Sequence, residues 1–322
     1  MARIETCNNL PNTRHFRLQQ LAQGVYAAIN RQDGWAIGNA GIVDMGDSTL
    51  VFDTTLTPAS AGELRASAEY LTGHSVSIVI NSHYHNDHTW GNMEFIPQSL
   101  VLSSTATREQ ILEKGKQEYL FYKTNASQQR AELQREYDDA TDERSRDALR
   151  SWLTYHQAVH KNLRRIRRIT PSMTFDEQLC LCGLDRQIEL LAFEDGHTDS
   201  DVILYLPAEG IIFMADLLCA GFHPYLEECD PQSLKAILGQ IANLDADTYV
   251  PGHGNIGSKG DLACMEEYVL LVDQLARQHI CSEKPEESLD SIPIPAQFQS
   301  WDFRQTFSTN LKASYRRLLE DN

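Results

Sequence analysis

The sequence predicts an α/β layered sandwich formed by one domain over residues 1–322, with a helical insertion at residues 105–169. Short apolar runs bounded by glycines and turn residues occupy the first hundred residues and return from Met173 onward. The stretch between them has no proline and one glycine, and it is dense in Glu, Gln, Arg and Lys. Two strand-rich halves of this kind indicate stacked layers whose strand ends meet at one rim.

The first half of the chain alternates apolar runs with turns. A helix is expected near residues 59–72, because Pro58 occupies a position that favours the first helical turn. The β-branched run at residues 76–80 predicts a buried strand that leads directly into a histidine-rich segment. The strands expected in this half are Val25–Ile29, Ala40–Met45, Thr49–Asp53, Val76–Ile80 and Val101–Ser103.

The insertion is predicted to contain two or three long helices, forming a hairpin within the domain. Its helical spacing is clearest in Leu149, Trp152, Leu153, His156, Val159, Leu163 and Ile166. Three roles are open for it: simple packing, a lid over a pocket, or the interface of a homodimer. It ends in a basic cluster, which is either a solvated last helical turn or a contact for an anion: Arg164, Arg165, Arg167 and Arg168.

The second half returns to strands and then to helices. Helices are expected at Gln232–Leu244 and at about Lys259–His279. Residues 282–322 form a C-terminal extension that starts with three prolines and ends in a short helix around Leu311–Leu319. The strands expected in this half are Leu179–Cys182, Ile188–Phe193, Val202–Leu206, Ile211–Met214 and Thr248–Val250.

Charge and composition narrow the classes of partner. The chain has 28 Lys and Arg against 45 Asp and Glu, a net charge of −17, so nucleic acid is an unfavourable partner. No apolar run approaches the length of a membrane span, and the N-terminus lacks the apolar core of a signal peptide. The seven cysteines show no disulfide framework. We therefore expect a cytoplasmic protein with free thiols and a small-molecule substrate.

Four potential metal ligands lie within the segment Asn81–His88, directly after a predicted strand. In an extended segment His83 and His85 point the same way, because side chains alternate with period two. The chain must then turn for Asp87 and His88 to reach back, and Asn-Asp favours a turn. Two groups of ligands can therefore face two adjacent metal positions.

Three further ligand types stand at the ends of later apolar runs. His197 follows Glu-Asp-Gly, Asp216 follows Ile211–Ala215, and His253 lies in Pro-Gly-His-Gly after a short strand. Imidazoles and carboxylates suit zinc, and they also suit iron or manganese. The other histidines are expected to be surface or core residues: His15, His74, His156, His160, His223 and His279.

The motifs H-Y-H-N-D-H, E-D-G-H-T-D-S-D, I-I-F-M-A-D-L-L and V-P-G-H-G together resemble those of the metallo-β-lactamase superfamily. The resemblance covers about residues 20–100 and 175–280, and it leaves out the insertion and the tail. It implies a four-layer αββα sandwich with two divalent metal ions, zinc being expected, at one edge. It also implies that His83, His85 and His197 hold one metal, that Asp87, His88 and His253 hold the other, and that Asp216 bridges them.

The same resemblance implies a hydrolase in which a hydroxide bridging the metals attacks the substrate. Asp87 is the expected catalytic residue, since it can orient the hydroxide and relay its proton. Thr198 and Asp195 are expected to support His197.

Two residues differ from those typical of particular branches of this superfamily, and these differences narrow the expected substrate class. Asp216 stands where some zinc β-lactamases carry a metal-binding cysteine, and His85 stands where the oxygen-reducing di-iron branch has glutamate. We therefore expect a small acyl substrate: a lactone, a thioester or a β-lactam-like amide. A phosphoesterase with the same site, and a non-hydrolytic metal-binding or redox protein, are the alternatives.

The segment after Asp216 is expected to line the pocket. His223 and Tyr225 are candidate catalytic donors to an oxyanion, although both also suit packing. Cys219 stands where the quorum-signal lactonases tend to carry a tyrosine, which speaks against that assignment. Three aromatic residues suit either a pocket wall or the core: Tyr84, Trp90 and Phe95.

Overall fold

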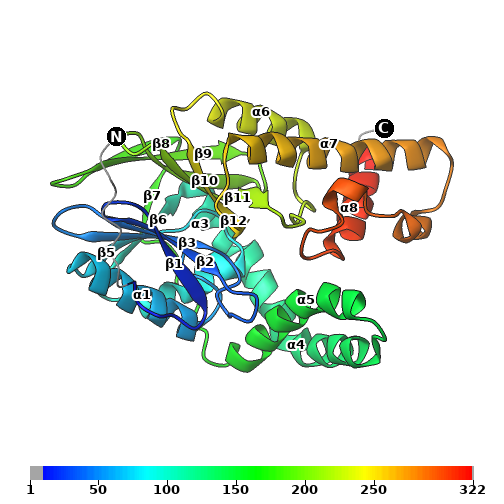
Figure 1. Cartoon of the computed structure of the whole chain (residues 1–322), viewed down its shortest axis with the longest axis horizontal. Coiled ribbons are helices and arrows are strands. Elements are labelled where there is room, and N and C mark those ends of the chain that lie inside the picture. Colours follow the sequence, from blue (N-terminus) through cyan, green and yellow to red (C-terminus); the bar gives the residue numbers. More distant parts are fainter. Residues whose placement is uncertain (1–9, 321–322) are drawn as a thin grey trace.

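The computed structural model describes residues 10–320 and contains two β-sheets stacked face to face (Figure 1). The first sheet has seven strands in chain order: β1 (Phe16–Ala22), β2 (Val25–Asn30), β3 (Ala40–Asp44), β4 (Thr49–Phe52), β5 (Val76–Ile80), β6 (Leu100–Ser104) and β7 (Met173–Phe175). Strands β1 to β4 are antiparallel and β4 to β7 are parallel. The sheet is therefore mixed.

The second sheet has five strands in the order β12-β11-β10-β9-β8. They are β8 (Gln178–Cys182), β9 (Gln187–Glu194), β10 (Ser200–Leu206), β11 (Ile211–Ala220) and β12 (Thr248–Gly254). The last pair, β11 and β12, is parallel, and the other pairs are antiparallel.

Helices cover the outer faces of both sheets (Figure 1). Helix α1 (Pro58–Thr72) packs on the first sheet, and α6 (Pro231–Ile241) and α7 (Lys259–Cys281) cover the second. Helix α1 begins in a capping box between Thr57 and Ser60 and ends at Gly73, whose φ of 75° only glycine adopts without cost. The four-layer αββα arrangement confirms the predicted fold class.

The main core lies between the two sheets. Strands of the first sheet contribute Val43 and Phe52, and the second sheet contributes Leu204 and Phe213, all of which are almost fully buried. The rings of Phe52 and Phe213 lie 6.0 Å apart across the interface between the sheets. Burial of each such side chain contributes about 1.5–3 kcal/mol, so this interface fixes how the two strand-rich halves face each other.

Three helices occupy the predicted insertion between β6 and β7: α3 (Thr105–Leu112), α4 (Lys114–Asp139) and α5 (Glu143–Asn162). Helices α4 and α5 form the predicted hairpin, which extends from one end of the sandwich (Figure 1). Helix α5 starts at Asp142, whose carboxylate accepts a hydrogen bond from the backbone N–H of Ser145. The basic cluster lies after the end of α5, so its expected position in the last helical turn is wrong.

The tail packs against α7 on the opposite side of the same end of the molecule (Figure 1). It contains two short 3₁₀ helices and α8 (Thr306–Glu320), which is longer than the helix expected there. Within the described residues, no helix is long and apolar enough to cross a membrane. The described cysteines are free. Cys7 and the other residues of 1–9, where a signal peptide would begin, lie outside the described residues.

Most expected elements lie within one or two residues of the observed ones, but strand β1 was not expected. Its sequence, FRLQQLA, lacks a regular apolar alternation, and its register with β2 shifts between Gln20 and Ala22. Strand β11 also runs on to Ala220, well beyond its expected end at Met214. Both differences lie at strand irregularities, which a period-two pattern does not reveal.

Candidate metal centre

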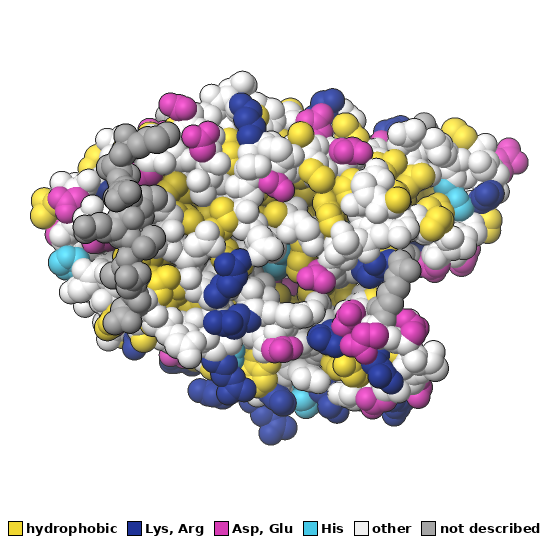
Figure 2. All heavy atoms as spheres, viewed as in Figure 1, with side chains coloured by type: hydrophobic (Ala, Val, Ile, Leu, Met, Phe, Trp, Pro, Cys, Tyr) yellow, Lys and Arg dark blue, Asp and Glu magenta, His cyan; other side chains and the backbone are white. Residues whose placement is uncertain are grey.

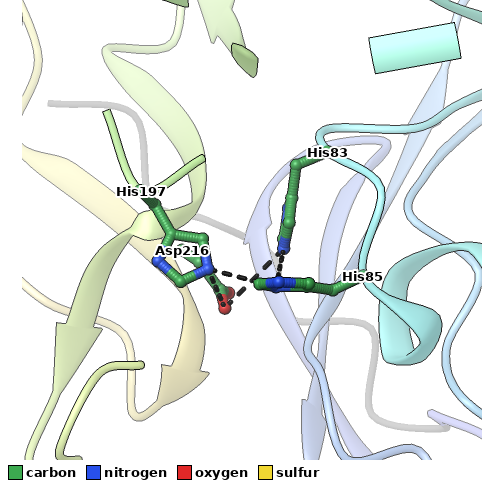
Figure 3. Close-up of side chains that lie close together, drawn as sticks. All are labelled: His83, His85, His197 and Asp216. Atoms are coloured by element: carbon green, nitrogen blue, oxygen red, sulfur yellow. Dashed lines mark hydrogen bonds and ion pairs between the residues drawn. The ribbon is translucent and has the colours of Figure 1, made fainter. Parts of the chain in front are cut away.

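The structure brings the seven predicted metal ligands together at one rim of the sandwich. His83 and His85 lie in the segment after β5, and His197 lies in the turn between β9 and β10. Figure 3 shows these rings approaching one another from opposite sheets, with the carboxylate of Asp216 below them. The segment after β5, in the first half of the chain, and the segments around β9–β10, β11 and β12, in the second half, therefore all contribute candidate ligands.

The segment after His85 turns into a short helix, α2 (Asn86–Thr89), as the Asn-Asp pair predicts. This turn sends Asp87 and His88 back toward the rim, where both are buried. His253 reaches the same place from β12. The ligands therefore form two groups, one of which contains His83, His85, His197 and Asp216 and the other Asp87, His88 and His253.

Asp216 lies inside strand β11 and not at its end, because the strand is bent there. Ala215 has a φ of 45°, and the register between β11 and β12 shifts on both sides of this residue. The bend turns the carboxylate toward the rim. Glycine is required at position 252 of the neighbouring strand, since a Cβ there would lie 1.8 Å from Asp216 Oδ1.

The atoms of the first group are close enough to share one ion. His85 Nδ1 lies 3.0 Å from His83 Nε2 and 3.2 Å from His197 Nε2. Asp216 Oδ2 lies 3.4 Å from His197 Nε2. Tetrahedral zinc bound to nitrogens at about 2.1 Å places neighbouring nitrogens roughly 3.4 Å apart, so the observed spacing fits such an ion.

Asp216 also reaches the second group. Its Oδ1 lies 3.3 Å from His88 Nε2, and its Oδ2 lies 3.3 Å from His253 Nε2. Asp87 Oδ2 lies 3.4 Å from His253 Nε2 and 3.7 Å from His88 Nε2. His88 Nε2 and Asp216 Oδ1 are buried and make no hydrogen bond, and a cation between them would satisfy both.

Burial and carboxylates act in opposite directions on the imidazoles. Burial lowers the pKa of His85 and of His197 to about 3, so both rings are neutral and able to ligate near pH 7. Burial also lowers the pKa of His88, but the carboxylates of Asp216 and Asp87 outweigh it and raise this pKa well above its ordinary value. The cluster therefore has a surplus of negative charge that a proton or a metal cation neutralises.

Two residues that the sequence analysis missed hold the ligands in place. Asp53 Oδ2 lies 2.8 Å from His88 Nδ1, which leaves Nε2 of that ring to face the rim. The same carboxylate accepts hydrogen bonds from the backbone and hydroxyl of Ser82, whose Oγ lies 2.9 Å from His83 Nδ1. Asp53 directly follows strand β4, the same signal that drew attention to Asp216.

The expected supports of His197 are only partly correct. Asp195 is exposed and makes no contact with His197 among the interactions of the described residues. The turn is held instead by buried Asp201, whose carboxylate accepts hydrogen bonds from the backbone N–H and the hydroxyl of Thr198. The ring orientation thus depends on the backbone of the turn.

A family model for the metallo-beta-lactamase superfamily matches residues 33–253, a range that contains all seven ligands. The chain belongs to the metallo-β-lactamase superfamily. The family that the motifs resemble is therefore the family whose model matches the chain.

Solved structures of metallo-β-lactamases share the fold of this superfamily member. The enzyme from Pontibacter korlensis has a TM-score of 0.56 and 16% identity, over 80% of this chain and 99% of that one. The one from Hirschia baltica has a TM-score of 0.56 and 13% identity, over 80% and 98%. The DIM-1 metallo-β-lactamase has a TM-score of 0.56 and 16% identity, also over 80% and 98%. A comparison with curated proteins gives no match.

In this metallo-β-lactamase fold a cavity of about 560 Å³ opens onto the ligands. Figure 2 shows the molecule notched between the helical hairpin and the helices of the tail. His85, Asp87, Asp216 and His253 form the inner end of the cavity. Aromatic rings from α4, α5, the segment after β11 and the tail line its walls: Phe121, Tyr122, Trp152, Tyr155, Phe222, Tyr225 and Phe303.

The two candidate oxyanion donors have different surroundings. Tyr225 lies at the cavity wall, 37% exposed, with its ring centroid 5.9 Å from that of His85. His223 borders the cavity but is 1% exposed, and its Nδ1 lies 2.8 Å from the hydroxyl of Tyr268. Burial lowers the pKa of His223 to about 4, so this ring is neutral and held by its partner in the tail-side core.

The three aromatic residues that suited either a pocket wall or the core fall into both classes. Tyr84 lines the cavity, and its hydroxyl donates a hydrogen bond to Glu228 at 2.8 Å. Trp90 and Phe95 are core residues, with 3% and 0% exposure. Cys219 is a buried residue of β11, and burial raises the pKa of its thiol.

None of the four basic residues at the end of the insertion lines the cavity. Three of them are exposed, and the guanidinium of Arg168 donates to the carbonyl of Ile111. Within the described residues, the cluster therefore offers no contact to a substrate seated on the metal ligands.

Proposed function

We propose that this protein is a dinuclear metallohydrolase that cleaves a small acyl substrate: a lactone, a thioester or a β-lactam-like amide. Membership of the superfamily and the two groups of ligands support a metal-dependent hydrolase in general. Two divalent ions bound there, zinc first among them, would supply a water of lowered pKa and would polarise the substrate carbonyl.

The residues that line the cavity favour an acyl substrate over a phosphodiester. Of the residues that line it in the described part of the chain, Lys114 is the one lysine or arginine. Its Nζ is already paired with Asp199 Oδ2 at 2.6 Å and with Glu228 Oε2 at 2.9 Å. A phosphodiester needs cationic partners along its length, whereas an acyl compound fits aromatic walls with few polar groups. The phosphoesterase alternative is thereby disfavoured.

Residues of the chain have distinct roles in this proposal. Asp87 borders both the cavity and the second ligand group, so its carboxylate is positioned to orient the attacking water and to accept its proton. Tyr225 stands beside His85 at the wall, where its hydroxyl, hydrogen-bonded to Glu227, would turn to donate to the developing oxyanion. Burial and nearby Glu227 raise the pKa of Tyr225, which keeps the hydroxyl protonated.

The first test is a panel of β-lactam, lactone, thioester and phosphodiester probes, assayed on zinc-loaded protein with and without chelator. We expect turnover of one acyl class, loss of that turnover with chelator, and recovery with zinc. His85→Ala should abolish it, and His160→Ala, an exposed histidine on α5, should leave it unchanged. Turnover of the phosphodiester alone would overturn the acyl assignment. Silence across the panel in metal-loaded protein would favour a non-hydrolytic role.

A further inference from the structure

Glu118 on helix α4 is a carboxyl group in the cavity wall that the proposed mechanism does not use. Its Oε2 is buried and makes no hydrogen bond. Burial and the nearby carboxylate of Asp87 raise the pKa of Glu118 well above its ordinary value, and Arg168 only partly offsets them. A buried carboxyl oxygen without a partner is costly, so the position calls for a hydrogen-bond donor from outside the chain.

Six other polar side chains of this wall are already paired with one another. The side-chain amide of Asn86 donates to the hydroxyl of Tyr155 at 2.7 Å, and that hydroxyl donates to Tyr122 Oη at 2.9 Å. Tyr84 donates to Glu228, which also binds Lys114. Among these side chains Glu118 is thus left with a buried carboxyl oxygen, Oε2, that has no hydrogen-bond partner.

Aromatic rings line the same cavity as Glu118. Tyr122 and Trp152 come from the hairpin, and Phe303 comes from the tail. The ring centroids of Trp152 and Phe303 lie 4.8 Å apart, so the hairpin and the tail form the cavity wall together. Such walls favour an apolar or aromatic group on the ligand, and aromatic rings also tolerate a nearby ammonium.

We propose that the cavity selects acyl substrates that carry a protonated amino group on an apolar or aromatic body, and that Glu118 binds this amino group. The proposal rests on the acyl hydrolase function above. A bound ammonium favours the ionised carboxylate that burial and Asp87 disfavour in the free protein, and the proton that Glu118 gives up leaves to solvent. A substrate carboxylate would lie near Asp87 and could not pair with Lys114, which Asp199 and Glu228 already hold. Glu118 is then a residue that determines specificity, separate from the metal ligands.

The test compares two thioesters that differ only in the amine, the S-ethyl thioesters of phenylalanine and of 3-phenylpropionate. We expect the zinc-loaded protein to prefer the amino compound in kcat/KM, and Glu118→Gln to reduce that value about 10- to 100-fold. The deamino compound should change less than about twofold. Glu136→Gln, an exposed glutamate on the same helix, serves as the matched control, and thermal melting checks that each variant folds.

A binding measurement separates failure of this proposal from failure of the proposed function. Calorimetric titration of the metal-loaded protein with phenethylamine and with 3-phenylpropionate needs no turnover. Tighter binding of phenethylamine that Glu118→Gln removes supports the amine site even if neither thioester is cleaved. Equal affinity for the two probes, or an equal loss of both in the variant, overturns it.

Discussion

The group of His83, His85 and His197 and the group of Asp87, His88 and His253 lie side by side, but their charges differ. In the first group burial dominates and lowers the pKa of each histidine. In the second group burial is outweighed by carboxylates, which raise the pKa of His88 and of His253. Asp216 contacts both groups, whereas Asp53 contacts the second directly and reaches the first only through Ser82.

This difference indicates that two adjacent groups of candidate ligands at one rim need not have equal affinity for a cation. A neutral three-histidine group competes with few protons for its ion, whereas the aspartate-containing group binds protons in the same pH range as metal. Since two carboxylates, Asp87 and Asp216, also attract a cation, the second group is both more acidic and more dependent on pH. Three experiments test whether the two groups of candidate ligands differ in this way.

Replacement of the shared ligand should have the largest effect. In Asp216→Ala both groups lose a carboxylate, so we expect metal affinity to fall by more than about 100-fold and turnover to disappear. Elemental analysis after gel filtration measures the metal, with exposed Asp33→Ala as the control. Full activity and full metal content in Asp216→Ala would refute its bridging position.

Loss of a supporting carboxylate should have an intermediate effect that is larger at one group, because Asp53 contacts His88 directly and His83 only through Ser82. Asp53→Asn removes the charge beside His88 Nδ1, and we expect one of two zinc equivalents to bind about 10- to 100-fold more weakly. Competition titration with a chromophoric chelator resolves the two equivalents. Asp195→Asn, an exposed change two residues before His197, should alter neither. Equal weakening of both equivalents by Asp53→Asn would show that the groups are not independent.

Acidification should release the metals in order, which is the smallest effect. His88 and His253 bind protons at higher pH than His85 and His197, because their pKa values are raised, while His85 and His197 stay neutral until about pH 3. Protons therefore compete with metal at the second group first, and we expect one metal equivalent to leave at higher pH than the other. Metal content after dialysis at stepped pH measures this, and simultaneous release would contradict the distinction between the groups.

Residue type and spacing were sufficient to predict the layered fold and the seven side chains that the structure brings together at one rim. The four ligands of residues 83–88 are close in sequence, and the other three stand where apolar runs meet polar residues. Asp53 also follows an apolar strand, β4. A single aspartate at a strand end does not indicate a site by itself, and its role is clear only from its contact with the ring of His88. The sequence does not show that Asp53 and His88 are 2.8 Å apart.

The walls of the cavity could not be predicted in the same way. Trp152 lies at helical spacing in α5, and that pattern does not distinguish a core position from a pocket wall. Its neighbour Phe303 comes from a tail with no periodicity to follow. Glu118 reads as one of many charged residues on a long helix, and its burial depends on contacts between segments far apart in the chain. The homodimer expected through the insertion stays a prediction.

The contact between Trp152 and Phe303 has a consequence for how the protein is made. A ribosome that has delivered His253 has delivered every ligand, but Phe303 follows about fifty residues later, some 3–10 s at the usual pace of synthesis. During that interval all seven residues of the candidate metal site have been synthesised, whereas Phe303 has not. The contact between the hairpin and the tail therefore forms only after every residue of that site is already in the chain.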